Sequence, residues 1–263
     1  MKNKIKNLLL LFGVTLLIAC TSTAPITGRK QLKLVDDASL VQSSVASYNQ
    51  LINQTKAQGM LANNTANGRR LASIGKRVAT AVETYMVQNG MQDRIKYLNW
   101  EFNLINSKDI NAFAMPGGKI AFYTGILPVL KTDAAIAFVM GHEIGHVIGG
   151  HHAEGASNQQ LAGLASGLTN IFVGGLTSSL VNDGLSLGLL KFNRTQEYEA
   201  DKYGLIFMAM AGYNPEEGVK AEERMASVSG NNGSDFASTH PASQKRIQAL
   251  KEFLPEAMKY YRK

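Results

Sequence analysis

The stretch FVMGHEIGHVIGGHH, residues Phe138–His152, contains four of the five histidines in this chain of 263 residues. His142 and His146 are four residues apart, which on an α-helix places both imidazoles on one face, about 6 Å apart along the axis. Two such imidazoles can share one Zn²⁺ ion, while Glu143 leaves the helix in a neighbouring direction and can reach a water beside the metal. This spacing is therefore typical of a metalloprotease.

A second segment offers the third ligand that a catalytic zinc requires beside an open fourth position. The sequence TQEYEADKYG places Glu197 and Asp201 four residues apart on a predicted helix. One of these carboxylates can bind the metal, and the other can accept the free N–H of a ligand histidine. Glu199 is the rival for the third ligand, although it points to a different side of this helix. A solvated acidic helix N-terminus is the alternative interpretation.

The remaining pattern alternates between helices and strands. Apolar spacings of three and four predict helices from Ala38 and around 71–85. Residues 95–105 and the segments on either side of Pro-Gly-Gly predict strands, and Gly117 and Gly118 supply the positive φ that such a turn needs. Further helices are predicted after an N-cap at Thr132 or Asp133, over 196–211 and 215–227, and from Pro241 onward.

The first residues predict export and a lipid anchor. Three lysines precede the apolar run Leu8–Ala19, which is too short for an ordinary transmembrane helix. The run ends in LIAC at Cys20, the only cysteine, and this resembles a bacterial lipobox with cleavage before Cys20 and lipid on its thiol and new amine. A plain signal peptide with an incidental cysteine is the alternative. Thr21, rather than Asp, after Cys20 favours the outer membrane.

The domain organisation follows from these features. We expect a lipoprotein signal peptide over 1–19, a polar tether over 20–35 and the catalytic domain over 36–263. Residues 161–190 are rich in Gly, Ser and Leu and predict a small-residue helical hairpin near the active site or a lid, in preference to a transmembrane helix.

The net charge of +7 comes without a basic run interleaved with aromatics, which argues against nucleic-acid binding.

HEIGH together with EYEAD resembles the gluzincin metallopeptidases of the HtpX, BepA and LoiP group, whose third ligand is the first Glu of an E-x-x-x-D helix. The stretch 111–127, NAFAMPGGKIAFYTGIL, resembles the strand–turn–strand before the HExxH helix of that group, and 239–247, THPASQKRI, resembles its T-H-P…R-I segment. The lipobox resembles in particular the LoiP-like outer-membrane lipoprotein proteases. The resemblance implies an α+β fold: a mainly helical zincin-type metalloprotease domain with a small β-sheet whose edge strand precedes the HExxH helix.

The resemblance also implies roles for individual residues. It implies three protein ligands for one Zn²⁺ per chain, namely His142, His146 and Glu197. Glu143 would be the general base, and Asp201 would support a ligand histidine. His240 would cap the open metal position at rest or stabilise the oxyanion, with a turn histidine before Pro241 as the alternative. Arg246 would assist near the site or form a structural salt bridge. We expect His151 and His152, which lie past the motif, to face solvent.

The segment before the Pro-Gly-Gly turn is the candidate substrate-binding strand. An exposed edge strand there would pair with the backbone of an extended peptide, and a sheet interior is the alternative. The residues concerned are Asn111, Ala112, Phe113 and Ala114.

The functional expectation is a zinc-dependent endopeptidase of the bacterial envelope, anchored in the outer membrane through lipid on Cys20 and facing the periplasm. It would cleave unfolded or misassembled periplasmic and outer-membrane proteins by attack of a metal-activated water. One alternative is a periplasmic chaperone or assembly factor for outer-membrane proteins, with a secondary or self-inhibited protease site and the outer-membrane assembly machinery as partner. The other is a zinc hydrolase directed at peptidoglycan.

Overall fold

The computed structural model describes residues 21–165, 191–232, 236, 239–240 and 243–261. The predicted signal peptide, the predicted lipidation site Cys20 and residues 166–190 of the predicted hairpin lie outside this part. No helix in the described part is long and apolar enough to cross a membrane. The elements that position the site are β1 (Thr21–Thr23), β2 (Lys30–Leu32), α2 (Asp37–Ala57), α3 (Ala66–Gln88), β3 (Glu101–Ile105), β4 (Ala112–Met115), β5 (Lys119–Tyr123), α5 (Asp133–Ile148), α6 (His151–Ala165), α8 (Arg194–Met210), α9 (Glu216–Asn232) and α11 (Gln244–Met258).

The three-stranded sheet has the order β3-β5-β4, with β3 parallel and β4 antiparallel to the central β5. β4 is therefore an edge strand and precedes the histidine helix, as predicted. The turn between β4 and β5 contains Gly117 (φ 96°) and Gly118 (φ 76°), a conformation that glycine adopts without strain. The predicted strand over 95–105 is partly wrong, because residues 92–97 form a 3₁₀ helix. Pairing with β5 starts only at Glu101, opposite Lys119, so the residues upstream have no partner strand.

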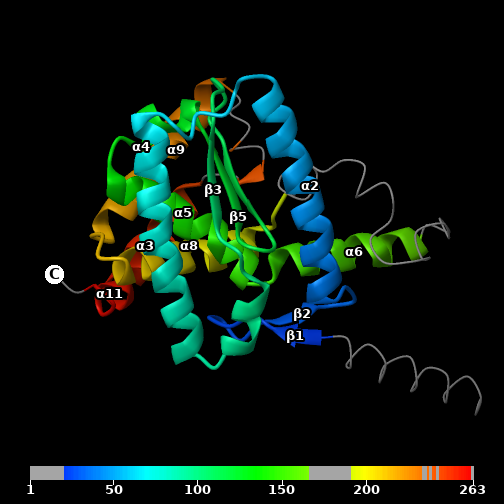
Figure 1. The fold of residues 1–263 in the computed structure, drawn as a ribbon. Coiled ribbons are helices and arrows are strands. Elements are labelled where there is room, and N and C mark those ends of the chain that lie inside the picture. Colours follow the sequence, from blue (N-terminus) through cyan, green and yellow to red (C-terminus); the bar gives the residue numbers. More distant parts are fainter. Residues whose placement is uncertain (1–20, 166–190, 233–235, 237–238, 241–242, 262–263) are drawn as a thin grey trace, which may run out of the picture.

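Both faces of this sheet are covered by helices (Figure 1). Alternate strand residues, such as Ala114 and Phe122, pack in the larger core cluster with side chains of α3, α5 and α8. Their neighbours, such as Phe113 and Met115, pack against α2 and α6. The sheet is thus an inner layer, and the mainly helical α+β class expected from the sequence is confirmed.

Helices α5 and α8 cross in close contact and carry the two motifs (Figure 1). A Cβ atom on Gly145, in the middle of HEIGH, would lie only 2.7 Å from Cβ of Tyr203 and 3.2 Å from the carbonyl oxygen of Ala200. α5 begins at the N-cap Thr132, whose hydroxyl accepts from the backbone N–H of Ala135. α8 begins at Asn193 with a capping box. The contact at Gly145 therefore determines how closely α5 can approach α8.

Residues 21–35, which the sequence suggests as a tether, form the β1–β2 hairpin with antiparallel pairing. The hairpin packs where α5 ends and α6 begins: the side-chain amide of Gln31 donates to the carbonyl of Gly149 over 2.7 Å. The backbone N–H of Leu34 donates to Oγ of Ser157 over 2.9 Å. This segment is therefore bound to the same helices that build the site.

Candidate metal centre

The two motif helices bring three predicted ligands together. Nε2 of His142 lies 3.1 Å from Nε2 of His146. Glu197 approaches both, with Oε2 3.8 Å from Nε2 of His142 and Oε1 3.6 Å from Nε2 of His146. Two ligand atoms of a tetrahedral zinc with bonds of about 2.0–2.1 Å are separated by about 3.3 Å. The ligand atoms of the three residues are therefore separated by distances close to those around one zinc ion.

The burial of Glu197 tests whether a cation fits there. Within the described part of the chain, neither carboxylate oxygen has a hydrogen-bond partner, although Nη1 of Arg246 forms an ion pair with Oε2 over 2.8 Å. Burial raises the pKa of Glu197 well above its ordinary value, while Arg246 acts in the opposite direction. A buried carboxylate with unsatisfied oxygens is costly, and a bound cation removes that cost. Two imidazoles and one carboxylate are a zinc donor set, so the residues fit the metal.

Asp201 fixes the orientation of the first ligand histidine. Its Oδ1 lies 3.0 Å from Nδ1 of His142, and Arg246 donates two hydrogen bonds to the same carboxylate. Burial alone would raise the pKa of Asp201, but Arg246 outweighs it and the pKa falls to about 2. Burial lowers the pKa of His142. An ionised Asp201 thus accepts the Nδ1 proton of a neutral His142 and leaves the Nε2 lone pair for the metal.

His151 and His152 are buried, and the expectation that they face solvent is wrong. Their exposed fractions are 0% and 2%. Gly150 has a φ of 76°, which ends α5 and starts α6 in a new direction, so the helical face extrapolated from HEIGH does not continue. Nδ1 of His151 lies 2.9 Å from Nδ1 of His146. Glu199, the rival third ligand, faces away from the metal point and contacts Nε2 of His151 at 3.0 Å.

Glu143 and His240 complete the centre. Oε1 of Glu143 has no hydrogen-bond partner and lies 3.6 Å from Nε2 of His240, which also has none. Burial raises the pKa of Glu143 well above its ordinary value. His240 offers a ligand atom within 4.8 Å of those of the three residues named above as ligands. His240 therefore lies near enough to these three residues to be a fourth donor.

The predicted substrate-binding strand is covered in this structure. Asn111, Ala112, Phe113 and Ala114 are all buried. The backbone N–H of Ala112 donates to Oδ1 of Asn111 over 2.9 Å. The backbone carbonyl of Asn111 accepts from the N–H of Tyr123 in β5 over 3.0 Å. The backbone of Ala114 interacts with the side chains of both Glu143 and His152. A peptide can pair with this edge only after these contacts have been released.

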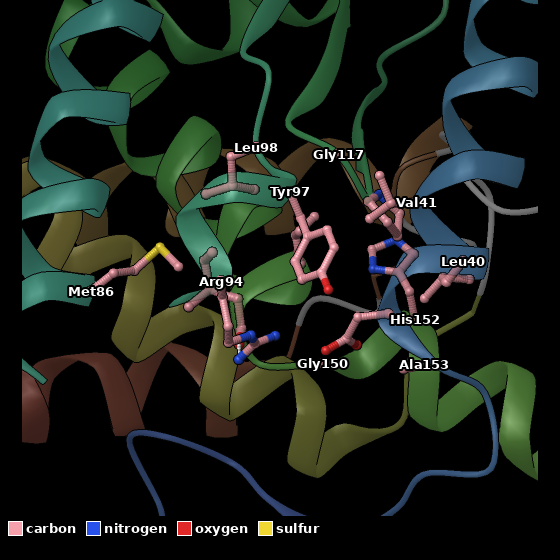
Figure 2. A pocket seen from close by; sticks show the side chains of 14 residues that line it. Leu40, Val41, Met86, Arg94, Tyr97, Leu98, Gly117, Gly150, His152 and Ala153 are labelled. Carbon is pink, nitrogen blue, oxygen red and sulfur yellow. Dashed lines mark hydrogen bonds between the residues drawn. The ribbon is translucent and has the colours of Figure 1, made fainter. Parts of the chain in front are cut away.

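A small pocket of about 50 Å³ lies where β4 ends. Figure 2 shows the side chains of Tyr97 and His152 on either side of it, with Val41 of α2 above His152. Nδ1 of His152 is buried and has no hydrogen-bond partner. The pocket is therefore lined by apolar side chains together with the polar side chains of Asp37, Arg94 and His152.

A mainly helical α+β domain with an edge strand, an HExxH helix and a glutamate from a second helix defines a zincin-type metallopeptidase. The chain belongs to Peptidase family M48, whose family model matches residues 66–254. M48 metallopeptidases use zinc, which agrees with the donor set described above.

Individual relatives agree with the family. The mitochondrial metalloendopeptidase OMA1 of Arabidopsis thaliana is 37% identical over 63% of this chain and 34% of its own length. OMA1 of Saccharomyces cerevisiae is 32% identical over 99% of this chain and 77% of its length. The metalloprotease LoiP of Escherichia coli is 31% identical over 63% of this chain and 67% of its length. The chain thus spans about a third of the plant protein and a larger part of the other two.

Proposed function

We propose that this protein is a zinc-dependent endopeptidase of the bacterial envelope that cleaves unfolded or misassembled periplasmic and outer-membrane proteins. One observation carries the activity. Glu143, with a buried carboxylate oxygen that has no partner among the described residues, lies 3.6 Å from Nε2 of His240, which itself offers a ligand atom within 4.8 Å of those of His142, His146 and Glu197. A carboxylate next to a metal point is the arrangement needed for peptide hydrolysis by water.

The residues divide the chemical work. Zinc, when bound, polarises the scissile carbonyl and makes the attacking water more acidic. Glu143 takes a proton from that water and delivers it to the nitrogen of the leaving amine. His240, turned away from its resting place, donates a hydrogen bond to the developing oxyanion. The edge groups of Ala112 and Ala114 hold the substrate backbone extended, which selects unfolded chains in preference to a particular sequence.

The envelope location rests on the sequence and on two relatives. The lipobox-like LIAC ending at Cys20 supports a lipid anchor, and Thr21 supports the outer membrane, with the domain facing the periplasm. LoiP of E. coli and the beta-barrel assembly-enhancing protease of E. coli, which is 26% identical over 56% of the chain, are bacterial relatives. OMA1 relatives are named as mitochondrial. A LoiP-like lipoprotein that meets the outer-membrane assembly machinery is the form we propose.

The closed edge of β4 favours a second candidate function. His240 stands near the three ligands, and the backbone of Ala114 is engaged by Glu143 and His152. A protease site that is closed at rest suits an assembly factor for outer-membrane proteins in which cleavage is secondary. In that case a Glu143→Gln variant rescues the phenotype of a deletion strain as well as the wild type does.

Proteolysis of an unfolded substrate tests the proposal. The purified protein is incubated with casein in zinc buffer, with a chelator, and as the Glu143→Gln variant. We expect cleavage by the wild type alone, and recovery when zinc is returned after the chelator. Glu252→Gln, the same substitution at an exposed glutamate, is the matched control and should cleave normally. Cleavage that survives both the chelator and Glu143→Gln would refute the proposal. Cleavage of purified muropeptides in place of casein would point to the peptidoglycan alternative.

A further inference from the structure

The two ligand histidines are supported in different ways. His142 is held by one carboxylate, because its Nδ1 faces Oδ1 of Asp201 at 3.0 Å. Among the residues that the structure describes, His146 has no carboxylate at its Nδ1. That atom lies 2.9 Å from Nδ1 of His151, which in turn reaches Glu199 through Nε2 at 3.0 Å. His146 is therefore supported by one histidine and one carboxylate in series, namely His151 and Glu199.

Only one arrangement of the ring protons of His146 and His151 is compatible with metal binding by His146. Nε2 of His146 points at the metal and must carry a lone pair, so its Nδ1 carries the proton and donates to Nδ1 of His151. His151 then carries its own proton on Nε2, which donates to Oε2 of Glu199. If His151 took the other tautomer, Nε2 of His146 would carry a hydrogen directed at the metal. Glu199 thus selects the tautomer of a ligand that it does not touch.

The N-terminal hairpin holds Glu199 in place. Nε and Nη2 of Arg29 donate to the two oxygens of Glu199, each over 3.0 Å. The same guanidinium donates to both oxygens of Glu154 on α6, over 2.7 and 2.8 Å. The hydroxyl of Thr27 donates to Oε1 of Glu199. Bidentate contacts of this kind fix the plane of a carboxylate as well as its charge.

We propose that Arg29 and Thr27 are positioning residues of the metal centre, which act through Glu199 and His151 to fix the tautomer and orientation of His146. Both residues precede residues 66–254, the part that the family model matches. The β1–β2 hairpin thereby helps to position a residue of the catalytic site. This inference rests on the metallopeptidase assignment of the proposed function but not on its substrate or location.

The test measures zinc affinity of the full chain by competition with a chromogenic chelator. Arg29→Met should raise the zinc Kd about 10-fold, the lower end of the range for groups that orient metal ligands. Arg29→Lys should recover part of this loss. Thr27→Val removes one hydroxyl at an exposed position and should raise the Kd by a smaller factor; it carries the test if Arg29→Met does not fold. Lys30→Met, at the neighbouring exposed cation whose Nζ donates to Oγ1 of Thr23 over 3.0 Å, is the matched control and should leave the Kd unchanged.

Two spectroscopic readouts separate positioning from a general loss of stability. The visible bands of the Co²⁺-loaded protein should change in Arg29→Met and stay as in the wild type in Lys30→Met. Nitrogen-15 shifts of the zinc-loaded wild type should show His151 protonated on Nε2. Wild-type affinity and unchanged Co²⁺ bands in both Arg29→Met and Thr27→Val would overturn the inference. A wild type that binds neither metal would instead overturn the proposed function.

Discussion

Nη2 of Arg246 lies 2.6 Å from Oδ1 of Asp201, the same oxygen that faces the ring of His142. Arg246 is 3% exposed and also stands within 2.8 Å of Glu197 and 3.5 Å of Glu222. One buried cation therefore compensates three buried carboxyl groups, of which one belongs to a proposed metal ligand and one contacts the ring of another.

Replacing this cation should damage the fold as well as the site. Arg246→Met leaves buried carboxylates without a counter-charge, which costs about 3–5 kcal/mol of unfolding free energy. Urea unfolding at neutral pH measures the loss. Arg69→Met, at an exposed arginine, should change stability by less than about 0.5 kcal/mol. Equal unfolding midpoints for the two variants would contradict the compensating role of Arg246.

Gly145 should set the distance between the ligand helices. In Gly145→Ala the new methyl meets Cβ of Tyr203 at 2.7 Å, so α5 and α8 have to separate. We expect a stability loss of about 1–3 kcal/mol from overpacking and a higher zinc Kd, because Glu197 moves away from the histidines. Chelator competition and thermal unfolding measure the two effects. A more stable variant with normal zinc binding, as an ordinary helix glycine would give, would show that the helices do not depend on this contact.

His240 should restrain the resting enzyme. Its unpartnered Nε2 stands beside Glu143 and near the three ligands, where it competes with water and substrate. We expect His240→Ala to cleave short unfolded peptides several-fold faster than the wild type at low substrate concentration. Initial rates on a fluorogenic peptide provide the measurement. A fall in kcat with unchanged KM would contradict this restraint and leave His240 only its hydrogen bond to the oxyanion.

Removing zinc should lower the melting temperature. The oxygens of Glu197 are buried without hydrogen bonds to the described residues, so the folded protein without metal lacks the oxygen partner that a bound cation supplies. Zinc at 1,000 times its Kd stabilises a protein by about 4 kcal/mol, which for a chain of this size corresponds to a shift of roughly 10 °C. Thermal unfolding before and after chelation, and after zinc is returned, checks this. Identical melting curves would place the metal elsewhere.

Glu222 should make stability depend on pH. Burial raises its pKa from 4.5 to about 7, although Arg246 acts in the opposite direction. The folded protein therefore keeps this proton when the unfolded chain has lost it, and stability falls as the pH rises from 4.5 through 7. Glu222→Gln cannot titrate, so its decline over this window should be smaller than that of the wild type by roughly 2–3 kcal/mol. Urea titrations at pH 5 and 8 compare the two proteins, and parallel declines would refute the assignment.

Much of the metal site was predictable because its signals are local. The spacing of His142 and His146 is a property of one helix, and that of Glu197 and Asp201 is a property of another. The cap at Thr132 and the Pro-Gly-Gly turn are equally local and are as expected. The start of β3 was less accessible, because a strand forms only where a partner strand lies beside it.

The sequence by itself determined which residue types could bind zinc and which residue could act as the base, since ligand chemistry and helical spacing are written in consecutive residues. Only the tertiary structure decided that His151 and Glu199 support His146, and that Arg29 holds Glu199 from the N-terminal hairpin. The physical reason is the left-handed turn at Gly150, which redirects the chain and buries two histidines that a continuous helix would have left in solvent.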